Sequence, residues 1–359
     1  MKIRNIKCRA VAAPMKRPLA TSVATLTASA LLLIDLETDQ GIVGRSYLFG
    51  MGKHNLPPMA KLVEAMAEMV KGDEVAPLDL ERKLRARYTL LGVHNVVLIA
   101  MAGIDMAAWD AFAQSLGQPL VRVLGAAPRP IPAYNSKGLG IMPLAALAKE
   151  AEELVAEGFR AVKLRMGRPT AREDIEALRA VKKTIGNAVT LMVDFNQALT
   201  VAEALKRGRL IDEEGGVDWI EEPIRADDFA GAARLTRELA TPIQLGENFM
   251  GPEQMAQALA AGACDYAMPD AQRIGGVTGW LRAAALAQSA GVEMSSHLFP
   301  EVSCHLLAAT PTCHWLEYVD WANPVLEQPV ELKDGDVVIP SQSGAGIAWD
   351  EKAVARFAL

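Results

Sequence analysis

Apolar stretches at the start of the chain predict a β-hairpin followed by helices. Strand-like patterns lie at residues 2–11, 30–36 and 42–48. The last two flank Glu37-Thr38-Asp39-Gln40-Gly41, whose polar and glycine residues are typical of a hairpin turn. Helical spacing of apolar residues follows at 58–70 and 96–116. Strands followed by helices indicate an α+β unit, which we expect to cover residues 1–125.

From residue 126 onward, short apolar strand patterns alternate with helical ones. The strand-like runs are Ile131–Ser136, Arg160–Arg165, Thr190–Asn196, Asp218–Glu222, Ile243–Glu247, Asp265–Asp270, Glu293–His297 and His314–Val319. The helical patterns between them are Leu144–Glu157, Ala171–Ile185, Ala202–Glu214, Asp228–Leu239, Pro252–Ala261, Val277–Ala290 and Ser303–Ala309. This alternation predicts an α/β fold in which residues 126–320 form a closed β/α barrel with one helix altered. The tail, 321–359, is expected to pack back on the N-terminal unit.

Every predicted barrel strand ends in a polar or ionisable residue. The lead residues, 20 to 31 positions apart, are Ser136, Lys163, Asp194, Glu221, Glu247, Asp270, His297 and Glu317. Each step is about the length of one βα unit, so these side chains should meet at the carboxyl-terminal face of the barrel. Barrel enzymes carry their chemistry at that face.

Three carboxylates, Asp194, Glu221 and Glu247, stand at the ends of successive strands. They would repel one another unless a divalent cation binds between them. An all-oxygen ligand set favours Mg²⁺, with Mn²⁺ as a substitute, and the absence of Cys and His beside the three argues against zinc. Any one of them alone is also typical of a helix N-cap or an exposed residue after a strand. The matched positions of all three are the specific signal.

Basic side chains and two further acids occupy the neighbouring strand ends. Lys163 and Arg165 are two apart on one strand, so they point the same way. Asp270 would fix the tautomer of His297 and raise its basicity, so we expect the pair to act as a general base. Beside a cation, such a base can remove the proton next to a carboxylate. Glu317, kept protonated by burial and the other acids, could donate a hydrogen bond to the carboxylate oxygen.

Composition excludes several other classes of function. The 359 residues are 51% hydrophobic with a net charge of −6, which allows a large core and disfavours nucleic acid, because phosphates need basic patches. We find no signal peptide and no apolar run near the roughly 20 residues that span a bilayer. The four cysteines form no CxxC pair, so we expect a cytoplasmic protein with reduced thiols and no membrane partner. Two other histidines, His305 and His314, are assigned to structure.

Motifs along the whole chain resemble those of the enolase superfamily, in its mandelate racemase branch. They are GIDMAAWD (103–110), GFRAVKLRMG (158–167), MVDFNQ (192–197), WIEEP (219–223), GEN (246–248), AMPDA (267–271), IGGVTGW (274–280), SSHLF (295–299), HLLAATPT (305–312) and HWLE (314–317). The resemblance implies a (β/α)7β modified TIM barrel under an N-terminal α+β capping domain that the tail completes. It also implies a homo-oligomer, often an octamer, and a small-molecule carboxylate as substrate.

The resemblance further implies a role for each site residue. Asp194, Glu221 and Glu247 would bind Mg²⁺, and Lys163 would neutralise the substrate carboxylate. Ser136 and Asn196 would hydrogen-bond the substrate, Asp270–His297 would be the base, and Glu317 would be the electrophilic acid.

One position departs from the family pattern. Arg165 replaces the second lysine of the family's Lys-x-Lys pair, which looks like the base for the opposite face of the substrate. A guanidinium has a pKa above 12 and is a poor base at neutral pH. Racemisation needs proton transfer on both faces, whereas dehydration of a sugar acid could use His297 alone.

The segment 19–26 resembles the family's specificity loop and favours a racemase over a dehydratase. Its Leu19, Val23 and Leu26 would suit an aryl or alkyl 2-hydroxy acid, unless they are simply core residues. We therefore expect a racemase or epimerase of an apolar 2-hydroxy acid, with a sugar-acid dehydratase as the alternative. A third hypothesis, a non-catalytic barrel that binds metal and carboxylate, is disfavoured because a binding site has no need of a His–Asp dyad.

Overall fold

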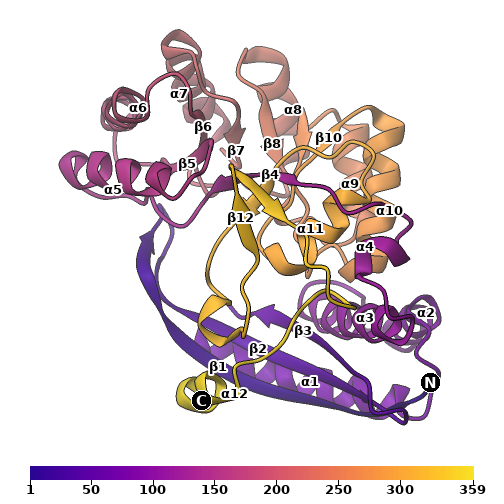
Figure 1. Cartoon of the computed structure of the whole chain (residues 1–359). Coiled ribbons are helices and arrows are strands. Elements are labelled where there is room, and N and C mark those ends of the chain that lie inside the picture. Colours follow the sequence, from indigo (N-terminus) through magenta and orange to yellow (C-terminus); the bar gives the residue numbers. More distant parts are fainter.

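A three-stranded antiparallel sheet with helices against it forms the N-terminal region, in indigo and purple in Figure 1. The computed structural model describes all residues, 1–359. The elements of this region are β1 (Ile3–Ala20), β2 (Thr25–Thr38), β3 (Val43–Phe49), η1 (Lys53–Asn55), α1 (Leu56–Val70), α2 (Pro77–Tyr88), α3 (Val96–Ser115) and α4 (Leu120–Val123). The predicted hairpin is confirmed as the pair β2–β3. Helix α2 was not predicted, because charged residues surround its narrow buried stripe of Leu80, Leu84 and Tyr88.

Eight parallel strands and seven helices alternate in the second region. They are β4 (Ile131–Asn135), α5 (Leu144–Ala156), β5 (Ala161–Arg165), α6 (Ala171–Ile185), β6 (Thr190–Asp194), α7 (Val201–Glu214), β7 (Ile220–Glu221), α8 (Phe229–Glu238), β8 (Ile243–Leu245), α9 (Pro252–Ala260), β9 (Tyr266–Ala267), α10 (Gly276–Ala290), β10 (Glu293–Met294), α11 (Pro300–Ala308) and β11 (Leu316–Tyr318). Consecutive strands from β4 to β10 are neighbours, and β11 pairs with β4. Backbone hydrogen bonds from Met294 N to Thr312 O (2.8 Å) and from Ser296 N to Trp315 O (2.9 Å) close the ring. The predicted modified TIM barrel with a capping domain is therefore confirmed.

The tail, shown in yellow, divides its contacts between the two regions (Figure 1). It contains η2 (Asn323–Val325), β12 (Glu331–Lys333), β13 (Asp336–Val338) and α12 (Glu351–Phe357). Strand β13 pairs antiparallel with β4 of the barrel. After α12, Leu359 N donates to Ala10 O of β1 at 3.0 Å. The tail therefore contacts both the barrel and the cap.

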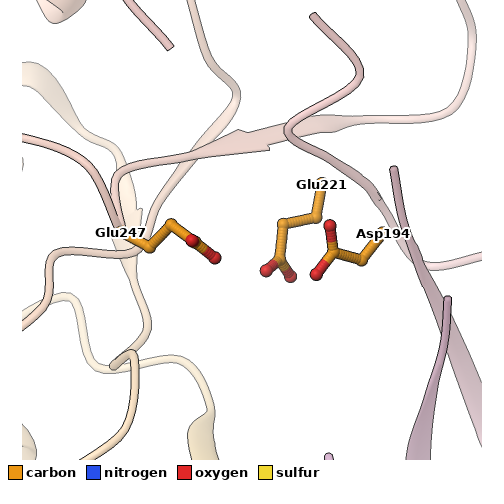
Figure 2. A group of neighbouring side chains, drawn as sticks. All are labelled: Asp194, Glu221 and Glu247. Carbon is orange, nitrogen blue, oxygen red and sulfur yellow. The ribbon is translucent and has the colours of Figure 1, made fainter. Parts of the chain in front are cut away.

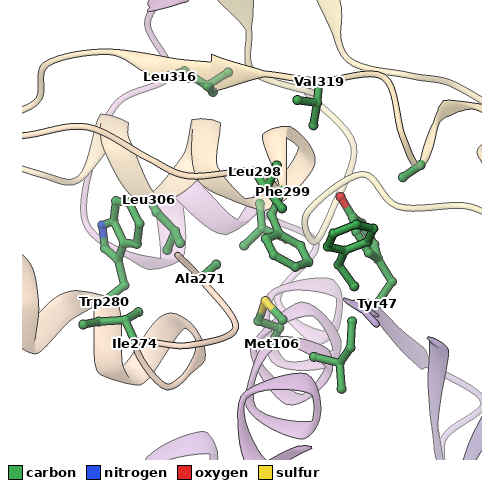
Figure 3. Close-up of a cluster of buried hydrophobic side chains, with 14 of the residues drawn as sticks. Tyr47, Met106, Ala271, Ile274, Trp280, Leu298, Phe299, Leu306, Leu316 and Val319 are labelled. Carbon is green, nitrogen blue, oxygen red and sulfur yellow. The ribbon is translucent and has the colours of Figure 1, made fainter. Parts of the chain in front are cut away.

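A continuous apolar core joins the cap to the barrel. Figure 3 shows Tyr47 of β3 and Met106 of α3 close to Ala271, Phe299 and other barrel residues. Helix α3 is long and apolar enough to cross a membrane, but 89% of its most apolar window is buried inside the fold. It is a core helix between the two regions, and the shared core holds the cap over one end of the barrel.

A buried histidine at this junction predicts a pH-dependent stability. His305 Nδ1 accepts a hydrogen bond from Val121 N at 3.2 Å, and burial lowers the pKa of His305 to about 4. The ordinary value is about 6.5, so between these pH values the unfolded chain binds more protons and the free energy of unfolding falls as the pH falls. We expect His305→Asn, which keeps an acceptor, to remove up to about 3 kcal/mol of that loss. Urea unfolding of the wild type and of His305→Asn between pH 4 and 7 measures the free energy of unfolding of each. Parallel plots of this free energy against pH would contradict the prediction.

Candidate active site

Three carboxylates converge at the carboxyl-terminal end of the barrel strands. Asp194 ends β6, Glu221 ends β7 and Glu247 lies two residues after β8. Figure 2 shows the three groups pointing toward one another, and one oxygen of each lies within 4.8 Å of those of the other two. The first two side chains are fully buried and the third is partly exposed. Oxygen-only donors at this separation fit a hard divalent cation such as Mg²⁺.

Two buried basic side chains lie against these acids. Lys163 Nζ is 2.6 Å from Glu221 Oε1, 2.7 Å from Glu317 Oε1 and 3.3 Å from Asp194 Oδ2. Arg165 forms an ion pair with Asp194 and donates to Ser136 Oγ at 2.9 Å. Because the side chains of Lys163 and Arg165 project to the same side of β5, one strand supplies both positive charges.

These charges correct the prediction for Glu317. Burial raises its pKa, but Lys163, His297 and Arg165 outweigh burial and hold the pKa well below the ordinary value. Glu317 is therefore ionised in this structure, not protonated as we predicted. Its Oε1 accepts from Ser136 Oγ at 2.7 Å and its Oε2 accepts from Leu298 N at 3.0 Å. The sequence predicted the burial but not the two cations at contact distance.

Burial does raise the pKa of two neighbouring acids, Glu221 and Glu222. Burial and the charge of Asp194 raise the pKa of Glu221 to about 8, although Lys163 lowers it. Asp194 behaves differently, because Lys163 and Arg165 outweigh the effect of burial and lower its pKa. A carboxylate with a raised pKa is destabilised in its charged form, and a cation bound between the acids would relieve that cost.

His297 and Asp270 form the predicted pair. His297 Nδ1 lies 2.7 Å from Asp270 Oδ2, while His297 Nε2 is 3.5 Å from Glu247 Oε2 and 3.7 Å from Glu317 Oε2. Asp270 Oδ1 accepts from the backbone N–H groups of residues 272 and 273, which fixes the carboxylate. Burial lowers the pKa of His297, but Glu247, Glu317 and Asp270 outweigh it and raise the pKa to about 9. Part of this shift comes from Glu247, whose charge a bound cation would neutralise.

Arg165 lines the same cavity as His297. Burial lowers the pKa of its guanidinium, but Asp194, Glu317 and Glu221 outweigh burial and raise the pKa further above the ordinary value. At neutral pH the guanidinium of Arg165 is therefore almost entirely charged.

The tip of the β1–β2 hairpin covers the site. Ser22 Oγ donates to Phe195 O at 3.0 Å, and Ile141 N donates to Ala20 O at 2.8 Å. Gly140 permits this approach, since a Cβ there would lie 2.7 Å from Ala20 O. The tip thereby brings Leu19, Val23 and Leu26 to the rim of the cavity with Asn196.

The cavity itself measures about 170 Å³ and has an apolar and a polar wall. The apolar wall consists of Leu19, Val23, Ala24, Leu26, Phe49, Met51, Leu298 and Trp321. The polar lining residues are Thr21, Arg165, Asn196, Gln197, Glu222, Glu247, Asn248, Arg273 and His297. Phe49, Met51 and Trp321 come from the cap and the tail and were not predicted, because no strand-end rule applies to them. Arg273 was missed as well, although it follows Asp270 by three residues.

The comparisons with known proteins place the chain in a family. Residues 3–125 match the model of the mandelate racemase/muconate lactonizing enzyme N-terminal domain, and residues 146–353 match the enolase C-terminal domain-like model. A crystal structure of an enolase from an alpha proteobacterium, BAL199, with bound magnesium is 44% identical, with a TM-score of 0.97, and the match covers 100% of this chain and 99% of that one. An enolase from Bradyrhizobium complexed with magnesium and mandelic acid is 40% identical, with a TM-score of 0.95, covering 100% and 98%.

Similar proteins of known activity divide between reaction types. L-talarate/galactarate dehydratase of Salmonella typhimurium is 33% identical over 91% of this chain and 82% of its own length. N-succinylamino acid racemase of Thermus thermophilus is 31% identical over 100% of this chain and 98% of its own length. The predicted Mg²⁺ cofactor is confirmed at the level of the family, because several of its solved members contain bound magnesium. The chain belongs to the mandelate racemase/muconate lactonizing enzyme family of the enolase superfamily.

Proposed function

We propose that the protein removes the α-proton of an apolar 2-hydroxy acid and acts as a racemase or epimerase. The observation that carries this proposal is the apolar wall of the cavity, eight hydrophobic residues that share the lining with His297. A polyhydroxylated substrate would leave hydroxyl groups against that wall without hydrogen-bond partners, which is costly. Mandelic acid in the Bradyrhizobium relative supports the same substrate class.

The size of the cavity supports an aryl or short alkyl substituent. Dry protein cavities of about 150 Å³ hold a benzene ring, and this one measures about 170 Å³. Val23 and Met51 on its wall are 69% and 50% exposed. An apolar substituent would cover both side chains and gain burial energy.

The site residues divide the work of the reaction. Asp194, Glu221 and Glu247 would hold Mg²⁺, which supplies positive charge beside the substrate carboxylate when bound. Lys163 would place a second positive charge there. His297, oriented by Asp270, would take the α-proton at Nε2, and Ser136 and Asn196 would hydrogen-bond the substrate. A purely binding barrel has no use for the 2.7 Å contact between His297 and Asp270.

Arg165 favours a second candidate function, dehydration of a sugar acid. A guanidinium that is almost entirely charged is a poor proton acceptor, and dehydration needs only His297, which would take the α-proton and return it to the leaving hydroxyl. The similarity to L-talarate/galactarate dehydratase supports this alternative.

Proton exchange distinguishes the two functions. The Mg²⁺-loaded enzyme is incubated in D₂O with each enantiomer of mandelate and, separately, with a panel of aldonic and aldaric acids. Loss of the α-proton signal by NMR together with inversion supports the racemase. Exchange without inversion, or a 2-keto-3-deoxy product from the panel, supports one-base chemistry. Absence of exchange with both mandelate enantiomers overturns the first proposal.

Removal of one proposed ligand tests the metal site. We expect Glu247→Ala to weaken Mg²⁺ binding at least about tenfold, because only two of the three proposed carboxylate ligands, Asp194 and Glu221, would remain. Isothermal calorimetry of the metal-free protein measures this affinity. The control is Glu253→Ala on α9, which removes an equal charge from an exposed side chain. Equal affinity of the two variants would refute the assignment.

A further inference from the structure

We propose that Gln272 sets the selectivity of the cavity for an aryl substituent, by fixing Phe49 at a set distance from the His297–Asp270 pair. This inference rests on the proposed function, since it concerns the substrate end that meets the apolar wall. Gln272 lies in the loop between β9 and α10 and is 2% exposed. It is a positioning residue, because it does not line the cavity and would act on the substrate only through Phe49 and on His297 only through Asp270.

The side-chain amide of Gln272 binds the free edge of the cap sheet. β3 is the edge strand, and its last residue, Phe49, pairs with Leu31 on one side only. On the other side Gln272 Oε1 accepts from Phe49 N at 3.0 Å, and Gln272 Nε2 donates to Phe49 O at 3.4 Å. The amide thus takes the place of a further strand at this one residue.

The backbone of Gln272 binds the base. Its N–H donates to Asp270 Oδ1 at 2.8 Å, and Asp270 Oδ2 contacts His297 Nδ1 at 2.7 Å. Two short sets of hydrogen bonds, joined by Gln272 itself, therefore connect the base in the barrel to Phe49 in the cap. Ala271, the residue before Gln272, packs in the junction core near Phe299 and Tyr47 (Figure 3), which restrains the loop.

Phe49 is the end of this chain that a substrate would touch. Its ring packs on Trp321 with centroids 5.0 Å apart, and both residues line the cavity. Without the Gln272 amide, the N–H and C=O of Phe49 would be buried and unpaired, so the end of β3 would shift to find other partners. The wall would then fit a ring less closely, while a methyl group would lose little contact.

The experiment compares dissociation constants of mandelate and lactate, which differ in a phenyl and a methyl group. Calorimetry on the Mg²⁺-loaded protein measures both and requires no turnover. We expect the wild type to prefer mandelate and Gln272→Met, similar in size but without the amide, to reduce that preference about tenfold. The affinity for lactate should change less than twofold.

The matched control is Thr278→Val, which removes two other buried cap–barrel hydrogen bonds: Thr278 Oγ1 accepts from Trp109 Nε1 at 2.9 Å and donates to Asp105 Oδ1. Thr278 does not line the cavity, so this variant should keep the wild-type preference even if its melting temperature falls. The inference is overturned if Gln272→Met keeps the wild-type preference, if it weakens both ligands equally, or if the wild type shows no preference. Failure of the proposed function is seen separately, as absence of α-proton exchange in D₂O by a wild type that binds both acids.

Discussion

His297→Asn is expected to lower the rate of α-proton exchange at least about 1000-fold on the face of the substrate that His297 meets. Asparagine occupies similar space and can still contact Asp270, but it has no nitrogen that accepts a proton. The barrier rises because neither basic side chain nearby can replace His297: Lys163 is bound by three carboxylates, and Arg165 stays charged. NMR in D₂O measures the rate for each enantiomer of mandelate.

Two further measurements show whether the slower exchange in His297→Asn comes from the missing base or from a disturbed site. Mg²⁺ affinity by calorimetry should stay within about threefold of the wild type, because His297 contacts Glu247 at 3.5 Å but is not a proposed ligand. Asp270→Asn should keep more activity than His297→Asn, since it disturbs only the orientation and charge partner of the imidazole. Full exchange activity in His297→Asn would remove the dyad from the mechanism.

The sequence predicted the site well where the fold itself fixes positions. Parallel barrel strands deliver their last residues to one face, so the spacing of Asp194, Glu221 and Glu247 was enough to bring them together. The same rule placed His297 beside Asp270. These predictions needed only the order of strands and the period of one βα unit.

Predictions that depend on distances between side chains were less successful. Glu317 was expected to be protonated because it is buried among acids. Lys163 at 2.7 Å helps to reverse the direction of its pKa shift, so that the pKa is lowered. At such separations a few tenths of an ångström and the local dielectric constant decide whether an acid is protonated or ionised. A list of strand ends contains neither quantity.

The cap was predictable as a hairpin and helices but not as a wall of the site. Phe49, Met51 and Trp321 reach the cavity only because the cap docks on one particular end of the barrel. That docking depends on many buried contacts spread over α3, α10 and the loop at Ala271, and no short motif encodes it. The hairpin tip was recognised through its resemblance to a specificity loop, not through its own pattern.

Arg165→Lys is expected to raise the rate of racemisation of mandelate by about 100-fold to 1000-fold. The ordinary pKa of lysine lies about 2 to 3 units below that of arginine, so at neutral pH the neutral base is that much more abundant. The acids that raise the pKa of Arg165 would raise that of a lysine as well, so the expected gain rests on the difference between the two groups in the same surroundings. In the wild type, exchange at His297 should therefore be faster than inversion, and the variant should bring the two rates together.

The matched variant is Arg165→Met, which removes the guanidinium without supplying a base. If the gain in Arg165→Lys came merely from releasing Asp194, which pairs with Arg165, the methionine variant would gain as well. We expect it to keep exchange at His297 and to show no inversion, measured by NMR and by polarimetry on each enantiomer. Equal inversion rates in all three proteins would mean that residue 165 transfers no proton. The proton on that face would then have to come from solvent through the cavity.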